Sequence, residues 1–282
     1  LSKKNLSWKL SKAHSNVNVA RGEFPINISQ GHLGEVGKIK VPLQDINTAT
    51  QLVLTLQTGP HVNKYDIWVY PDKEVSVKSD IKETSSLKQA LDLLQQGNKV
   101  LYIPDHKEVE KLSVGGLFTP DYWNYAMFKN ISEWLKRDVS PGTLSILTDP
   151  SHPLFKEFPT ETHSNWQWWI ISKNSRPFIL DRTPKNYKPL VQVIDNIERN
   201  HKLGLIFEMQ VGKGKLLVCM CDLKAISDKP EGKQFGQAII DYMSSTDFAP
   251  KNEYTAEDIK SLFSTSIKEK KIVGVKNITT YK

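Results

Sequence analysis

Short apolar runs with partial two-residue alternation dominate the first 70 residues of the chain. In Gln51–Gln57, the three leucines face one side of an extended backbone, while Val53 and Thr55 face the other. Gly, Pro, Asn and Asp separate this run from similar runs at Ser7–Leu10, Gly37–Pro42 and Tyr65–Tyr70. Short strands at this spacing predict a β-sandwich-like domain over residues 1–75.

The pattern changes after a charged stretch at residues 73–83. Helical spacing of apolar residues follows at Thr84–Gln96, and a buried strand is expected at Lys99–Ile103. Further helices are predicted at Asp121–Lys136, His152–Glu157, Glu231–Met243 and Ala256–Phe263, and further strands at Thr143–Leu147, Pro177–Leu180 and Leu190–Ile194. This alternation favours an α/β layer domain with a mainly parallel sheet over residues 76–250, followed by a helix and tail over residues 251–282.

Two apolar runs flank a turn that contains glycine. Leu203–Gln210 and Lys215–Met220 enclose Val211-Gly212-Lys213-Gly214, which predicts a β-hairpin that adds antiparallel strands to the sheet. The glycines resemble a phosphate-binding loop only superficially, because the required spacing and the following helix are missing.

Composition narrows the range of partners. The 282 residues carry a net charge of +7, but the lysines are scattered and form no basic stripe between stacking aromatic residues. We therefore expect a solvated surface and no nucleic-acid partner. No run of about 18 apolar residues predicts a membrane span. The chain begins at Leu1 without an apolar signal segment, so we expect it to be part of a longer polypeptide.

The densest aromatic feature places three of the seven tryptophans within four residues. Tryptophan faces can stack on sugar rings, and neighbouring amide and imidazole groups can bind hydroxyls. The candidate ligand-binding residues are accordingly His163, Asn165, Trp166, Trp168 and Trp169. The alternative is that these tryptophans fill a core or a domain interface, which is the more common place for large aromatic side chains.

A second candidate cluster follows the predicted strand that ends at Ile194. Asp195, Asn196 and Arg199 could line a crevice at the end of the sheet and contact a ligand there. Alternatively, their side chains close a turn or cap a helix, which is the more frequent role of Asp and Asn at such positions.

No catalytic or metal-binding motif is evident. Cys219 and Cys221 lie within an apolar strand and no histidine follows them, so neither a thiol nucleophile nor a metal site is predicted. The chain has no G-x-S-x-G sequence, and nothing pairs its carboxylates at the separation that glycoside hydrolysis requires. We expect no catalytic residue, cofactor or metal in this chain.

An ordered series of segments resembles the C-terminal region of large family 2 glycoside hydrolases of the β-galactosidase type, as found in gut Bacteroidetes. The segments are Phe118–Tyr125, Gly142–Pro153, Phe158–Trp169, Arg176–Asp181, Tyr187–Asn196, Asn200–Glu208 and Val211–Asp222. The stretch from Gly37 to Tyr70 resembles the β-domain that precedes this region in the family.

The resemblance implies a fold and a role. The second domain would be Rossmann- or flavodoxin-like, related to class I amidotransferases but without the nucleophile. Hydrolysis of O-glycosyl bonds would reside in an upstream (β/α)₈ barrel, in a periplasmic or extracellular parent protein. This chain would be a non-catalytic accessory region that contacts the barrel and upstream β-domains, helps a homo-oligomer to form, or shapes the substrate cleft.

Two other hypotheses remain open. The chain could be an independent carbohydrate-binding or protein-interaction module that uses Trp166, Trp168 and Trp169 as its contact surface. It could also be a hydrolase or transferase complete in itself, which the failed motif searches disfavour.

Overall fold

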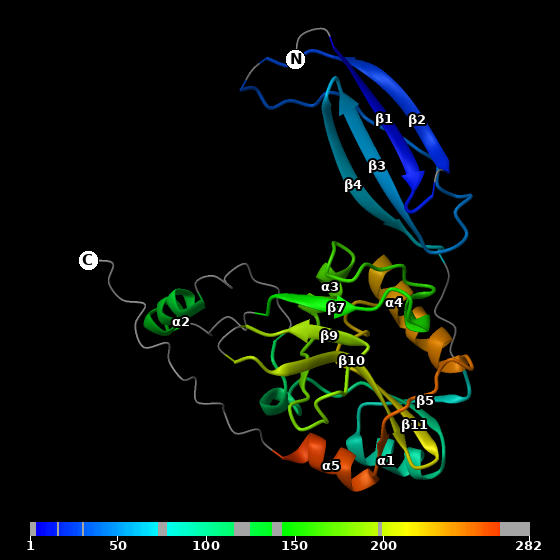
Figure 1. Cartoon of the computed structure of the whole chain (residues 1–282), viewed down its shortest axis with the longest axis vertical. Coiled ribbons are helices and arrows are strands. Elements are labelled where there is room, and N and C mark those ends of the chain that lie inside the picture. Colours follow the sequence, from blue (N-terminus) through cyan, green and yellow to red (C-terminus); the bar gives the residue numbers. More distant parts are fainter. Residues whose placement is uncertain are drawn as a thin grey trace. The chain divides into compact units, whose positions relative to one another are not determined.

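The computed structural model describes residues 4–15, 17–29, 31–72, 78–115, 125–136, 143–196 and 199–265. It divides into two compact units, one of Leu1–Glu74 with Glu157–Pro159 and the other of Val75–Lys156 with Thr160–Lys282 (Figure 1). None of the helices in the described ranges is long and apolar enough to cross a lipid bilayer.

The first unit contains a four-stranded antiparallel sheet in the order β2-β1-β3-β4. Its strands are β1 (Lys4–Lys12), β2 (Asn18–Ile26), β3 (Thr50–Thr58) and β4 (His61–Val69). The described residues of this unit form this one sheet, so the prediction of a sandwich of two packed sheets is wrong. The sequence analysis missed β2, because Gly22 and Pro25 interrupt its alternation of apolar and polar residues.

Two glycines of this unit lie against aromatic rings. A Cβ atom at Gly22 of β2 would lie 2.8 Å from Nε1 of Trp8, the residue opposite it on β1. A Cβ atom at Gly37 would lie 2.8 Å from the ring of Phe24. The backbone at Gly37 therefore packs on Phe24, and the prediction of a strand at Gly37–Pro42 is wrong.

The second unit is built on an eight-stranded mixed sheet. The order is β5-β6-β11-β10-β9-β7, and β8 and β12 also pair with β10. The strands are β5 (Ile81–Thr84), β6 (Lys99–Tyr102), β7 (Ser145–Thr148), β8 (Phe178–Ile179), β9 (Val191–Ile194), β10 (Lys202–Val211), β11 (Gly214–Cys219) and β12 (Glu253–Tyr254). Among the strands of the described residues, only the pairs β5–β6, β6–β11 and β10–β12 are parallel.

The prediction of a mainly parallel, Rossmann-like sheet is therefore wrong. Parallel neighbours need a long crossover, such as the helical connection from β5 to β6. In contrast, β9 reaches β10 through residues 195–201, and β10 turns directly into β11. These short connections force neighbouring strands to run antiparallel.

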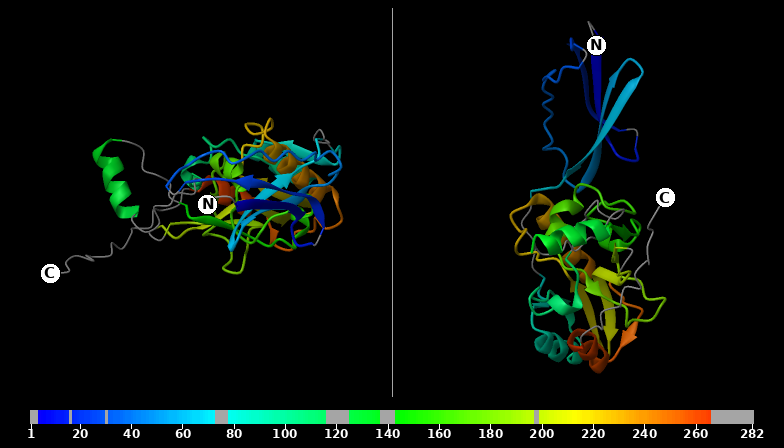
Figure 2. Two further views of the ribbon diagram at one scale, coloured as in Figure 1. Left: turned by 90° about the horizontal axis from the view of Figure 1, so that it is seen from above. Right: turned by 90° about the vertical axis from the view of Figure 1, so that its left-hand side faces the viewer.

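Helices lie on both faces of this sheet. One face is covered by α1 (Leu87–Gln95) and α5 (Ala256–Ser264), which lie side by side (Figures 1 and 2). They share a core cluster with Phe207 of β10 and Val218 of β11. The other face contacts α4 (Pro230–Ser244), which packs against α3 (Trp168–Lys173). From α4, Tyr242 donates a hydrogen bond of 2.7 Å to Glu208 of β10.

The remaining helices agree in part with the sequence pattern. α2 spans Tyr125–Trp134, within the predicted helix Asp121–Lys136, whose first four residues lie outside the described ranges. The short helix predicted at His152–Glu157 is a single 3₁₀ turn, η3 (Pro153–Phe155), and a second 3₁₀ turn, η1, spans Glu110–Leu112. Residues 266–282 of the predicted tail also lie outside the described ranges.

The predicted β10–β11 hairpin is confirmed, and its two glycines have different roles. Gly212 has a φ of +56°, a left-handed conformation that favours glycine. A Cβ atom at Gly214 would lie 2.7 Å from the backbone Cα of Leu94 in α1. Gly214 therefore allows the close packing of α1 on the start of β11.

We predict that Gly214→Ala lowers the free energy of unfolding by roughly 2–3 kcal/mol, because a methyl group overlaps a backbone that cannot rotate away. Gly212→Asn in the same turn is the control, since Asn tolerates a positive φ, and we expect a loss of less than about 1 kcal/mol. Urea unfolding of both variants measures these changes. Equal losses would contradict the role given to the Leu94 contact.

A histidine at the start of η3 makes stability depend on pH. Nδ1 of His152 accepts a hydrogen bond of 3.2 Å from the amide of Leu154, and the ring lies edge-on to Tyr242. Burial lowers the pKa of His152 below its usual value of 6.5, although Asp149 and Asp247 act in the opposite direction. The folded protein therefore favours the neutral imidazole.

We predict that His152 contributes stability above about pH 6.5 that is lost as the pH falls further, because the unfolded state then binds more protons than the folded state. Replacing it in His152→Asn keeps a capping acceptor but removes the titrating group. Urea unfolding at about pH 7.5 and about pH 5.5 should show a smaller acid-induced loss in the variant. An identical loss in both proteins would count against this role of His152.

Candidate functional site

The three clustered tryptophans differ in their environments. Trp168, the first residue of α3, is fully buried, and its ring packs edge-on against Phe155 and Phe235. Its Nε1 donates a hydrogen bond of 2.8 Å to Oγ1 of Thr160. Trp168 is therefore a core residue that fixes the start of α3 to the body of the unit.

The other two tryptophans are exposed and form the tryptophan pair. Trp166 is 78% exposed and Trp169 is 47% exposed, with ring centroids 6.4 Å apart and ring planes inclined by 62°. Leu147 on the edge strand β7 is also exposed, and its backbone forms a bridge with His163. Because the rings are not coplanar, the pair presents two faces in different directions.

Polar groups flank the tryptophan pair in sequence. Nδ2 of Asn165 donates a hydrogen bond of 3.1 Å to Oε2 of Glu161. Nε2 of His163 lies 3.9 Å from the same carboxylate oxygen, and the His163 side chain is 64% exposed. His163 and Asn165 thus come together at one carboxylate, next to the exposed rings.

The second candidate cluster forms an ion-paired loop between β9 and β10. Both carboxylate oxygens of Asp195 accept hydrogen bonds, one from Nη2 of Arg199 at 2.6 Å and the other from the amide of His201 at 3.0 Å. Oδ1 of Asn196 accepts from the amide of Arg199 at 2.8 Å. These contacts favour the turn-closing interpretation of Asp195, Asn196 and Arg199 over ligand binding.

The two cysteines are unsuited to nucleophilic chemistry. Both side chains are fully buried, and Cys221 Sγ contacts the carbonyl oxygen of Ile171 at 3.5 Å. Burial raises the pKa of Cys219 to about 12 and also raises that of Cys221. Both thiols therefore remain protonated at neutral pH.

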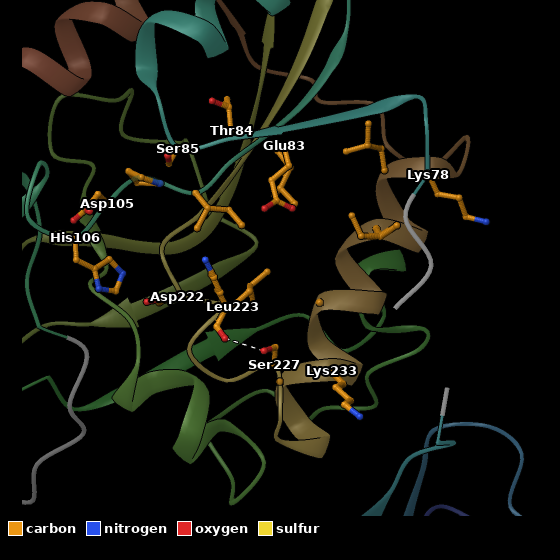
Figure 3. A pocket seen from close by; sticks show the side chains of 18 of the residues that line it. Lys78, Glu83, Thr84, Ser85, Asp105, His106, Asp222, Leu223, Ser227 and Lys233 are labelled. Atoms are coloured by element: carbon orange, nitrogen blue, oxygen red, sulfur yellow. Dashed lines mark hydrogen bonds between the residues drawn. The ribbon is translucent and has the colours of Figure 1, made fainter. Parts of the chain in front are cut away.

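The second unit also contains a cavity of about 930 Å³ that was not predicted from the sequence. It lies past the carboxyl ends of the parallel strands β5, β6 and β11 and is closed on another side by α4 (Figure 3). Such crevices are common ligand sites in open sheets that contain parallel strands. We call this space the β5–β6–β11 cavity.

Charged groups of both signs surround this cavity. Its lysines are Lys78, Lys107, Lys224 and Lys233, and its acidic residues are Glu83, Asp105 and Asp222. Figure 3 shows the side chains of Glu83 and His106 directed into the space. Nε2 of His106 lies 3.2 Å from the carbonyl oxygen of Met220. A carbonyl only accepts, so this contact places the proton on Nε2 and leaves Nδ1 as an acceptor.

Two glycines of α4 line the cavity for different reasons. A Cβ atom at Gly232 would lie 2.8 Å from Cγ1 of Ile226, so packing requires a glycine there. A Cβ atom at Gly236 would meet no atom within 4 Å. Glycine inside a helix costs about 1 kcal/mol relative to alanine, and packing against the rest of the chain does not explain this cost at Gly236.

A usable signal for this cavity was present in the sequence. Polar residues follow two predicted strands, at Asp105-His106 and Asp222. Polar residues at the carboxyl end of a strand often line a ligand crevice, and this expectation, stated above for Asp195, applies equally to these positions. The strand β5, where Glu83 and Thr84 lie, was not predicted, because residues 73–83 form a charged stretch and Thr84 was predicted to start a helix. Among the described residues, no group of three or more His, Cys, Asp or Glu side chains is arranged to hold a metal ion.

We predict that both thiols react with a disulfide reagent at least ~100-fold more slowly in the native chain than in urea, because reaction requires a solvent-accessible thiolate. Absorbance of the released thiol measures the two rates. Rapid labelling of one equivalent under native conditions would show that a cysteine is accessible, contrary to its burial.

Comparison with protein families gives two matches. Residues 1–71 match a domain of unknown function, DUF8488, and residues 82–264 match a second domain of unknown function, DUF8487. A search of curated proteins gave no match. Because the second match spans more than half of the sequence, the chain belongs to the DUF8487 family.

Proposed function

We propose that this chain is a non-catalytic accessory region of a family 2 glycoside hydrolase and that its tryptophan pair contacts the catalytic part of the same polypeptide. The ordered resemblance over Phe118–Asp222 supports the identity of the parent enzyme. That enzyme would act in the periplasm or outside the cell. The buried, protonated thiols of Cys219 and Cys221 fit a supporting role better than a nucleophilic one.

The observation that carries this proposal is the exposure of Trp166 and Trp169 on a well-anchored segment. Trp168 lies between them in the core, so the segment is held in place before any partner binds. Exposed tryptophans on a rigid support are the residues that most often dominate binding at protein interfaces. Burial against a neighbouring domain would remove their apolar surface from water.

Carbohydrate binding by the same surface is the second candidate. It is favoured by His163 and Asn165, which meet at Glu161 beside the exposed rings. Hydroxyl groups of a sugar could bind to the exposed side chain of His163 while one ring face stacks on the sugar, and Asn165 would hold Glu161 in place. The inclined rings would engage separate sugar units rather than one flat chain.

The test uses the full-length gene product that contains this chain. We predict that the double variant Trp166→Ala/Trp169→Ala lowers the temperature at which half of the glycosidase activity is lost by roughly 1–2 °C or more, because two buried aromatic residues contribute about 2 kcal/mol or more at an interface. Trp134→Ala is the matched control, since Trp134 is an exposed tryptophan on α2, and it should have little effect.

Three outcomes separate the hypotheses. A full-length product that does not hydrolyse aryl glycosides would overturn the assignment of the parent enzyme. An unchanged temperature of half-maximal activity loss in the double variant would overturn the contact role. Saturable quenching of tryptophan fluorescence by oligosaccharides, lost in the double variant but kept in Trp134→Ala, would establish carbohydrate binding instead.

A further inference from the structure

We propose that the β5–β6–β11 cavity binds a saccharide that carries an anionic group, a carboxylate or a phosphate. This site is separate from the tryptophan pair, and the inference does not depend on the accessory role proposed above. The volume of about 930 Å³ is sufficient for one or two sugar units.

The shape of the cavity indicates a ligand rather than a packing defect. Its walls come from the ends of three parallel strands and from one face of α4. On that face, the Cβ position of Gly236 opens into empty space, whereas that of Gly232 is occupied by Ile226. A ligand that approaches the helix backbone explains why residue 236 has no side chain.

The anionic group is expected at the amino end of α4. Lys233 and Ser227 lie at this side of the cavity in Figure 3, and Lys224 also lines it. In the described part of the chain, neither Lys224 nor Lys233 forms an ion pair with a carboxylate. A hydrogen bond from Lys229 lowers the pKa of Asp228, and the charge of Lys233 only contributes to this lowering. Both ammonium groups can therefore bind an anion. No side chain of the described residues caps the amino end of α4, so the backbone N–H groups of Glu231 and Gly232 add positive potential at the same end.

Hydroxyl groups are expected at the opposite side. Glu83 and His106 point into the space from two other strand ends, and Asp105 lies beside His106 (Figure 3). Carboxylates and the Nδ1 atom of His106 are acceptors, which suit the hydroxyl donors of a sugar. The apolar side chains of Leu101, Ile103 and Leu223 also line the cavity and can contact the C–H surface of a sugar ring.

Calorimetric titration of the 282-residue chain tests the proposal with four probes: galacturonate, glucose 6-phosphate, galactose and inorganic phosphate. We expect saturable binding of at least one anionic sugar, tighter than that of galactose and of inorganic phosphate. The difference between galacturonate and glucose 6-phosphate identifies the anionic group.

Two variants locate the site. Gly236→Leu fills the cavity and should abolish binding, while its thermal stability is kept or raised because leucine is a better helix former than glycine. Lys233→Gln should weaken binding of the anionic sugar roughly fivefold or more, since a charge-assisted hydrogen bond is lost. Lys260→Gln, which removes an exposed lysine from α5, is the matched control and should not change affinity.

Several results would overturn the proposal. No saturable heat with either anionic sugar at about 10 mM would exclude a site of useful affinity. Unchanged binding by Gly236→Leu would place the ligand elsewhere. Equal affinity for inorganic phosphate and the phosphorylated sugar would overturn the assignment of a saccharide ligand, and equal affinity for galactose would overturn that of an anionic one.

Discussion

Burial of the β10–β11 hairpin on both of its faces is the constraint on which the second unit depends. Most residues of these two strands are buried, whether they face α1 and α5 or α4. A sheet that is apolar on both faces needs a layer of helices on each side. The close contact of Gly214 with Leu94 brings α1 against the hairpin, and the hydrogen bond from Tyr242 to Glu208 joins α4 to the opposite face.

The space beyond the strand ends is filled differently at the two sides of the sheet. Beyond β9, the short loop to β10 uses Asp195 and Arg199 to fill its own space with an ion pair. Beyond β5, β6 and β11, loop residues 104–107 and 222–224 line a space that they do not fill, and α4 stands across it. The parallel part of the sheet therefore leaves a cavity, while the antiparallel part is closed by its own turns.

How far the sequence predicted this arrangement depends on how local each feature is. The hairpin at Gly212–Gly214 was predictable because its signal lies within a few residues. Strand direction was not, because it depends on which strands become neighbours. Burial of the clustered tryptophans was not predictable either: successive helical residues point about 100° apart, so Trp168 enters the core while Trp169 faces solvent. The polar residues after single strands were a signal for the cavity, but the cavity combines residues from Lys78 to Ile240, and no local pattern shows that these come together.

Residues whose type is unfavourable for their local structure or exposure are the best guide to function in this chain. Asp195 and Arg199 are explained locally, by the hydrogen bonds that Asp195 accepts within the loop. Trp166 exposes a large aromatic ring to water, and Gly236 weakens a helix without relieving any contact within the chain. Natural sequences keep such unfavourable choices mainly where a functional surface compensates for them. Both residues are therefore better explained by contact with a second molecule or domain than by the folding of this chain alone.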